Sequence, residues 1–195
     1  ETLFPYAETS RITITQGKGE FSLMVRYPGW VKPGLFSVKV NGQPMSIVTG
    51  PSSYVTIDRK WKKGDVVTIH FDMPVRTVKA HPAVADDRGR IAVERGPLVY
   101  CAEGVDNERF SICNFLMPTQ PRFRTAERTI NGTRDVTFNV TAIEVDGEAL
   151  DTDKLGHAHV RPAVLTMIPY YAWNHRGPGD MEVWMPQSIS ALGNY

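Results

Sequence analysis

The sequence contains little cysteine: Cys101 and Cys113 are the two among 195 residues. Two cysteines make neither a disulfide framework nor a zinc site. Apolar residues flank both, which favours buried free thiols, because a buried free cysteine behaves as a small hydrophobic side chain. A disulfide between them is the alternative. The cysteines therefore do not fix the redox compartment, and we favour a periplasmic or secreted location over the cytoplasm.

The sequence also lacks a long hydrophobic run and an excess of one charge. No apolar run approaches the roughly 20 residues of a membrane-spanning helix, so we expect no membrane partner. Lys and Arg number 22 and Asp and Glu number 21, a net charge of +1. This balance argues against a nucleic-acid partner, which would need a basic excess. Apolar residues make up 42%, enough for a core in one large or two small domains and too many for a disordered chain.

The start of the chain lacks both a methionine and a signal peptide. The first residue is Glu1, and no basic segment followed by an apolar segment comes after it. We therefore expect the chain to be a fragment of a longer protein. Such a fragment can lack the chemistry of the whole.

No motif of a catalytic nucleophile, a zinc protease or a phosphate-binding loop is present. The spacing of His157 and His159 can suit a metal ion on a strand, but no third ligand follows at a diagnostic spacing, and we expect solvated loop histidines. His70, His81 and His175 stand isolated. We expect no catalytic residue, no metal ion and no cofactor in this chain.

Carboxylates remain as candidates because glycoside hydrolysis usually uses two, held about 5 to 10 Å apart. Four lie in or near apolar strand patterns: Glu94, Glu103, Glu144 and Glu182. We expect them to be strand-edge carboxylates that face water or an arginine. Glu94 and Arg95 are expected to form a structural ion pair, because arginine offers a rigid fork to a carboxylate.

No stretch shows a helical stripe of apolar residues, and the dominant period is two. Apolar and polar residues alternate over residues 21–25, 36–40, 55–57, 67–71 and 136–140. This alternation is typical of half-buried antiparallel strands. Turn dipeptides separate the runs, and three of them predict type I′ hairpin turns: Asn41-Gly42, Asn131-Gly132 and Asp146-Gly147. The polar segment 151–162 is expected to be a loop.

Short strands at this spacing predict an all-β protein. A polar passage rich in Pro, Gly and Asp follows residue 76 and predicts a division there. We expect two consecutive antiparallel β-sandwich domains of jelly-roll-like form, over residues 1–76 and 77–195.

Aromatic residues are the candidate binding groups. Exposed rings can stack on sugars, because an aromatic side chain pairs an apolar face with a polar edge. The candidates for such a carbohydrate platform are Trp30, Tyr170, Tyr171 and Trp173. The alternative is that these rings fill the core or a domain interface.

Several segments together resemble one family. They are 25–30 (V-R-Y-P-G-W), 38–42, 54–65, 73–76, 89–101 (with R-G-P-L-V-Y-C) and 168–179 (I-P-Y-Y-A-W-N-H-R-G-P-G). In this order they resemble conserved blocks of glycoside hydrolase family 127 (GH127), the β-L-arabinofuranosidase family once described as DUF1680. The blocks cover nearly the whole chain.

The resemblance implies a bacterial glycoside hydrolase, but not a catalytic chain. In the family, an (α/α)6 barrel upstream of these blocks carries a cysteine nucleophile, a zinc site of further cysteines and a glutamate, and an acid/base glutamate. None of those motifs is present here. Cys101 belongs to the R-G-P-L-V-Y-C block and does not inherit the nucleophile's role, and Cys113 matches no catalytic position.

Three readings follow. The first is a non-catalytic sandwich region of an enzyme acting on plant-type arabinofuranosides, which packs on its barrel, stabilises it and allows a homo-oligomer interface. The second is an autonomous carbohydrate-binding module that uses the aromatic residues. The third is an enzyme in its own right, with Glu94 and Glu103 as the catalytic pair.

Overall fold

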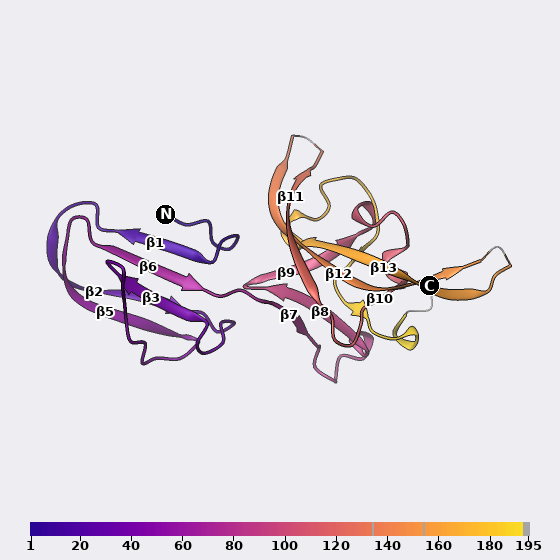
Figure 1. Cartoon of the computed structure of the whole chain (residues 1–195), viewed down its shortest axis with the longest axis horizontal. Helices are drawn as coiled ribbons and strands as arrows, with labels where there is room; N and C mark the ends of the chain where they lie inside the picture. Colours follow the sequence, from indigo (N-terminus) through magenta and orange to yellow (C-terminus); the bar gives the residue numbers. More distant parts are fainter. Residues whose placement is uncertain (134, 154, 193–195) are drawn as a thin grey trace. The chain divides into compact units, whose positions relative to one another are not determined.

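The structure is a computed structural model that describes residues 1–133, 135–153 and 155–192 (Figure 1). It confirms the predicted all-β class: antiparallel sheets dominate, and the helices among the described residues are single 3-10 turns of three residues. None of these helices is long and apolar enough to cross a membrane. The chain divides into two compact units, Glu1–Pro74 and Val75–Tyr195.

The first unit contains a four-stranded sheet and a two-stranded sheet, all antiparallel. The larger sheet has the order β1-β6-β3-β4, and β2 pairs with β5 along the whole of both strands. The strand bounds are β1 Thr9–Thr13, β2 Lys18–Tyr27, β3 Phe36–Val40, β4 Gln43–Pro44, β5 Ser53–Lys62 and β6 Val66–Phe71. One buried cluster draws on both sheets, as in a sandwich, with Val25 and Val55 from the smaller sheet and Val38 and Val67 from the larger one.

The first unit confirms one predicted turn. Asn41 and Gly42 have φ values of 50° and 80° between β3 and β4, the left-handed conformations that a type I′ turn requires. The Asn41 side chain also donates to Asp65 Oδ1 at 2.9 Å and accepts from the Val66 backbone N–H at 2.8 Å. The turn is therefore tied to the start of the neighbouring strand β6.

The second unit is built on a larger antiparallel sheet with the order β10-β12-β13-β9-β8-β15, to which β11, β14 and β7 add through β12, β9 and β8. The bounds are β7 Val75–Val78, β8 Arg90–Arg95, β9 Leu98–Glu103, β10 Phe115–Leu116, β11 Phe123–Asn131, β12 Thr137–Thr152, β13 Ala158–Pro169, β14 Met181–Glu182 and β15 Met185–Pro186. Short 3-10 turns lie at Ala85–Asp87 (η1), Gly104–Asp106 (η2), Ile112–Asn114 (η3), Tyr170–Ala172 (η4) and Ile189–Ala191 (η5).

Strand β9 is buried on both of its faces from Tyr100 onward. Tyr100 and Ala102 belong to one buried cluster, while Cys101, between them, belongs to another. Successive side chains of a strand point to opposite faces, so apolar material covers β9 from both sides. This explains why the segment reads as an unbroken apolar run in the sequence.

Two predicted turns are wrong. Asp146 and Gly147 lie inside β12, opposite Val164 and Ala163 of β13. Asn131 ends β11, and in the connection to β12 the described non-glycine residue with positive φ is Asp135, at 58°. Both glycines instead allow a neighbouring side chain to pack closely against the backbone. A Cβ atom on Gly147 would lie 2.4 Å from the ring of Phe115, and one on Gly132 would lie 2.8 Å from His175 Cβ.

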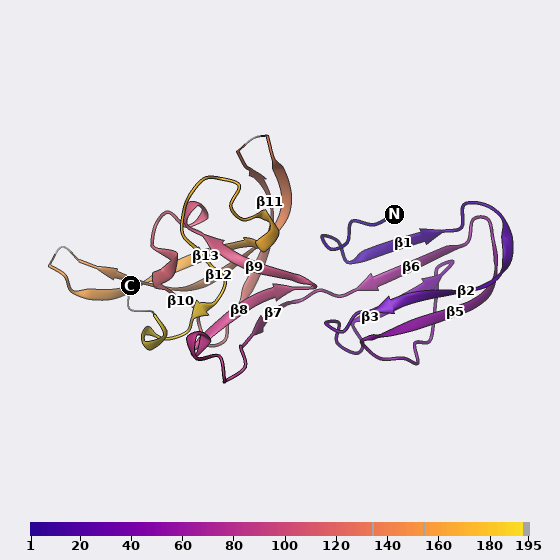
Figure 2. The same cartoon turned by 180° about the vertical axis from the view of Figure 1, so that it is seen from behind.

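The expected loop over residues 151–162 is also wrong. Most of the segment forms the end of the β12–β13 hairpin, in which Asp151 pairs with His159 and Leu150 with Val160. This end, drawn in orange, projects from the rest of the second unit (Figures 1 and 2). Both faces of such a ribbon meet water, so its sequence is polar on both faces and lacks the alternation that marks a half-buried strand.

Candidate functional site

Two of the four candidate aromatic residues meet at the surface of the second unit. Tyr170 begins η4, directly after β13, and its side chain is 44% exposed. Its ring centroid lies 5.6 Å from that of the half-buried Trp173, with an angle of 33° between the ring planes. Trp173 also packs against the smaller buried cluster of the second unit, so Tyr170 supplies the exposed ring of this pair.

The other two candidates are packed against apolar residues. Tyr171 lies against the smaller cluster of the second unit, with its ring edge-on to Phe138 at 5.9 Å. Trp30 belongs to the first unit, where it stacks on Phe4 at 6.2 Å and lies 6.1 Å from Phe71. Both rings are partly buried core residues, which is the alternative that the sequence left open.

The predicted ion pair between Glu94 and Arg95 is wrong. Glu94 instead forms an ion pair with Arg76 of β7. The reason is geometric: neighbouring residues of β8 point to opposite faces, whereas Arg76 lies directly opposite Glu94 in the β7–β8 pairing. Cross-strand partners of opposite charge on one face are the natural ion pairs of a sheet.

Glu103 belongs to a buried ion cluster. Arg176 donates to both oxygens of Asp106, at 2.7 Å and 2.6 Å, and also to Oε2 of Glu103. Oε1 of Glu103 accepts from the Asn174 backbone N–H at 3.2 Å. The side chains of Arg176, Glu103 and Asp106 are only 14%, 7% and 11% exposed. The two carboxylates raise the pKa of Arg176, and Asp106 has the larger effect.

The other two candidate carboxylates also face arginines. Glu144 accepts from Arg128 at 2.8 Å, and Glu182 lies 3.6 Å from Arg90. All four candidates are therefore ion-paired. In the β8–β9 pairing Glu94 lies opposite Val99, four residues before Glu103, which is roughly 13 Å along the strand and farther than the two carboxylates of a glycosidase stand.

Both cysteines are free thiols. Burial raises the pKa of Cys101 to about 12, and the charges of Glu103 and Asp106 act in the same direction. Burial also raises the pKa of the half-buried Cys113. A nucleophilic cysteine needs a lowered pKa, because the thiolate is the reactive form. Neither cysteine has the environment of a nucleophile.

The histidines of the β12–β13 hairpin are exposed and do not meet at a shared site. His157 contacts Asp153 Oδ2 at 3.1 Å, while His159 lies in β13 opposite Asp151.

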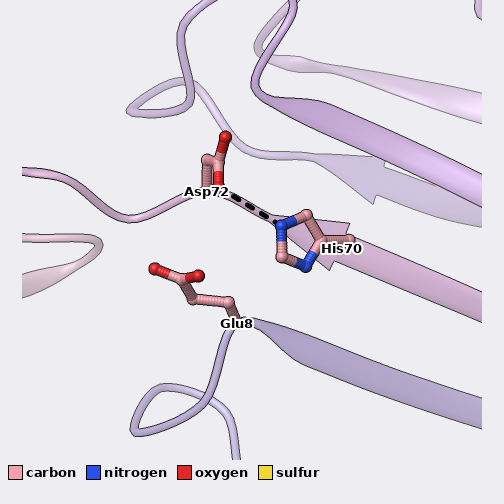
Figure 3. A group of neighbouring side chains, drawn as sticks. All are labelled: Glu8, His70 and Asp72. Atoms are coloured by element: carbon pink, nitrogen blue, oxygen red, sulfur yellow. Dashed lines mark hydrogen bonds and ion pairs between the residues drawn. The ribbon is translucent and has the colours of Figure 1, made fainter.

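His70, which the sequence showed only as an isolated histidine, has carboxylate neighbours in the structure. Among the described residues, the group of metal-ligand type comprises Glu8, His70 and Asp72 (Figure 3). The available signal was the spacing of His70 and Asp72, two residues apart at the end of the apolar alternation over residues 67–71. Glu8 becomes their neighbour through the pairing of β1 with β6.

The surface of the protein also has two grooves. One, of about 470 Å³, lies beside Arg109, Phe110 and Arg161, and the other, of about 490 Å³, lies over Phe21 and Arg59. None of the four candidate aromatic residues lines either of these two grooves.

Comparisons with known proteins place the chain in a family. Residues 1–73 match the description "Beta-L-arabinofuranosidase, GH127 middle domain", and residues 75–186 match "Glycoside hydrolase family 127 C-terminal domain". A non-reducing end β-L-arabinofuranosidase of Bifidobacterium longum subsp. longum is 30% identical over 172 residues, which are 82% of this chain and 25% of that protein.

Solved structures agree with this assignment. A GH127 β-arabinofuranosidase superposes with a TM-score of 0.88 at 43% identity, over 99% of this chain and 32% of that one. A GH127 β-L-arabinofuranosidase from Geobacillus stearothermophilus T6 superposes with a TM-score of 0.78 at 32% identity, over 95% of this chain and 29% of that one. The chain thus spans a quarter to a third of the length of these relatives. The chain belongs to glycoside hydrolase family 127, and its two units correspond to the middle and C-terminal domains of the family's β-L-arabinofuranosidases.

Proposed function

We propose that the chain is the non-catalytic β-sandwich region of a bacterial glycoside hydrolase that acts on plant-type arabinofuranosides. Its role is to pack on the (α/α)6 catalytic barrel and stabilise it. The observation that carries the proposal is the extent of the match: the middle and C-terminal domains account for residues 1–73 and 75–186, whereas the relatives are three to four times as long.

The chemistry of the chain supports this role. The candidate carboxylates are held by arginines, as Glu103 is by Arg176, and the Cys101 thiol is buried with a raised pKa. A buried ion pair and a thiol with a raised pKa are features of a packed interior rather than of a catalytic nucleophile.

A domain replacement tests the proposal. In the Bifidobacterium longum relative, the segment that matches this chain is deleted in one variant and replaced by this chain in another. Deletion is expected to lower the melting temperature and the soluble yield of the barrel, and replacement is expected to restore a substantial part of both. The chain alone is expected not to hydrolyse an aryl β-L-arabinofuranoside. A barrel that is equally stable and active without its sandwich region would contradict the stabilising role, and turnover by the chain alone would contradict the non-catalytic one.

Carbohydrate binding is a second candidate function, favoured by the exposed ring of Tyr170 beside Trp173. Stacking of a sugar on an aromatic ring uses such a surface. Titration with arabinan and arabinogalactan fragments tests it: binding should be lost in Trp173→Ala and retained in Trp30→Ala, because Trp30 packs against Phe4 and Phe71. Equal titration curves for the chain and its Trp173→Ala variant would exclude this function.

A further inference from the structure

Glu8, His70 and Asp72 of the first unit meet at the end of one strand pair. His70 lies in β6 and Asp72 follows that strand, while Glu8 directly precedes β1. The pairing places Thr9 opposite His70, and the Phe71 backbone N–H donates to the Glu8 carbonyl at 2.8 Å. This register brings a residue from the start of the chain beside two residues from the end of the first unit.

The three side chains converge. The possible ligand atoms of Glu8, His70 and Asp72 all lie within 4.8 Å of one another. Figure 3 shows the Glu8 carboxylate and the His70 ring on neighbouring backbone segments, with Asp72 above both. All three residues are half-buried. Carboxylate oxygens and an imidazole nitrogen are together the ligand atoms that a divalent transition-metal ion takes in proteins.

Groups outside the trio orient two of its members. Thr9 Oγ1 lies 3.3 Å from His70 Nδ1, and the Met73 backbone N–H donates to Glu8 Oε1 at 3.1 Å. With Nδ1 in this hydrogen bond, the other ring nitrogen of His70, Nε2, faces Asp72 Oδ1 at a distance of 3.3 Å. Metal-bound histidines have this arrangement, in which one ring nitrogen is hydrogen-bonded by an outer group and the other binds the ion.

The distance between His70 Nε2 and Asp72 Oδ1 also fits a small divalent ion. Two ligands of a tetrahedral zinc ion, with bonds of about 2.0–2.1 Å, stand roughly 3.4 Å apart, close to the distance between His70 Nε2 and Asp72 Oδ1. An imidazole nitrogen favours zinc and similar transition metals, because Ca²⁺ and Mg²⁺ prefer oxygen ligands alone. The half-exposed side chains of His70 and Asp72, 42% and 48% accessible, leave room for a water molecule as fourth ligand.

We propose that Glu8, His70 and Asp72 bind a divalent transition-metal ion of the zinc class, which clamps the start of β1 to the end of β6. β1 is the end strand of its sheet, with β6 as its sheet neighbour, and among the described residues it is bonded on its other side only by the first residues of the chain, where Arg11 exchanges hydrogen bonds with Glu1. An ion that binds only the folded state stabilises it by mass action. The proposal rests on the geometry of the first unit alone and does not depend on the proposed function.

Calorimetric titration of the untagged, chelator-treated chain tests the site. Zinc chloride is expected to bind with one-to-one stoichiometry and to raise the melting temperature of the first unit, whereas calcium chloride and magnesium chloride are not. His70→Gln, Asp72→Asn and Glu8→Gln are each expected to weaken zinc binding by at least about tenfold. His157→Gln is the matched control, because it removes another histidine–carboxylate contact, with Asp153, from an exposed hairpin.

A further variant and a spectroscopic measurement distinguish the loss of zinc binding from a folding defect. Thr9→Val keeps all three ligands, and it is expected to weaken zinc binding about 10- to 100-fold because it removes the hydrogen bond to His70 Nδ1. Cobalt(II) in place of zinc should give the visible absorption of a tetrahedral site in wild type and not in Asp72→Asn. Equal zinc affinity in wild type and His70→Gln, or equal loss in His157→Gln, would overturn the proposal.

Discussion

Gly147 lies against the ring of Phe115, so closely that a Cβ atom on Gly147 would stand 2.4 Å from Cζ of Phe115 and 2.7 Å from the Leu116 carbonyl oxygen. The contact follows from sheet geometry. β10 lies along β12, with Phe115 opposite Ala149. Phe115 is completely buried, so its ring is packed on all sides and a Cβ atom on Gly147 would press against it.

Gly147→Ala is therefore expected to destabilise the second unit by about 1–3 kcal/mol, the usual cost of overpacking a core. Gly19→Ala is the matched control, because Gly19 also lies in a strand but a Cβ there would meet nothing within 4 Å. Urea denaturation followed by circular dichroism measures both. Equal unfolding free energies for Gly147→Ala and the wild type would show that β10 moves away from β12.

Arg176→Met is expected to lower the free energy of unfolding by about 3–5 kcal/mol, because it leaves the carboxylates of Glu103 and Asp106 buried without their cation. Arg124→Met should change stability far less, since the ion pair of Arg124 with Asp146 is exposed, at 49% and 64%. Tryptophan fluorescence in urea compares the two variants. Similar losses in both would show that burial does not decide the strength of these ion pairs.

Asp65 makes the stability of the first unit depend on pH. Asn41 Nδ2 and the Lys62 backbone N–H donate to its carboxylate at 2.9 Å and 3.0 Å, and they lower its pKa below the ordinary 3.8. The stabilisation is complete above about pH 4 and is lost as the pH falls through the folded-state value.

Urea midpoints from pH 7 to pH 2 measure this dependence. Asp65→Asn should decline less steeply below pH 4 than the wild type, because asparagine has no proton to take up. Asp58→Asn, at an exposed position of β5, is the control and should keep the wild-type slope. A wild-type slope in Asp65→Asn would refute the assignment.

The two thiols should differ in reactivity. Cys101, buried and with its pKa raised to about 12, holds very little thiolate at pH 8 and is expected not to react with Ellman's reagent in the native chain. Cys113 is half-buried and is expected to react slowly. Cys113→Ser should abolish the native reaction, and denaturant should expose one thiol in that variant and two in wild type. Rapid native reaction of Cys113→Ser would contradict the burial of Cys101.

Local patterns predicted much of the fold. Alternation over residues 36–40 and 67–71 marks β3 and β6 because each has one buried face, and Asn41-Gly42 marks a turn because both residues take the left-handed conformation. The same dipeptide rule failed at Asp146-Gly147. A glycine serves a tight turn and a close contact equally well, and the sequence does not distinguish the two uses.

The sequence by itself determined the all-β class, the antiparallel pairing signals and the family resemblance, because these depend on period, on turn residues and on short linear motifs. Only the tertiary structure decided which side chains meet. Arg76 rather than Arg95 holds Glu94, Arg176 holds Glu103, and Glu8 reaches His70 and Asp72. For Arg76 and Glu8 the physical reason is strand register, which joins residues that are distant in the chain and is fixed by the packing of whole sheets rather than by any local pattern. Arg176 lies in the connection between η4 and β14 and meets Glu103 because β14 pairs with the end of β9.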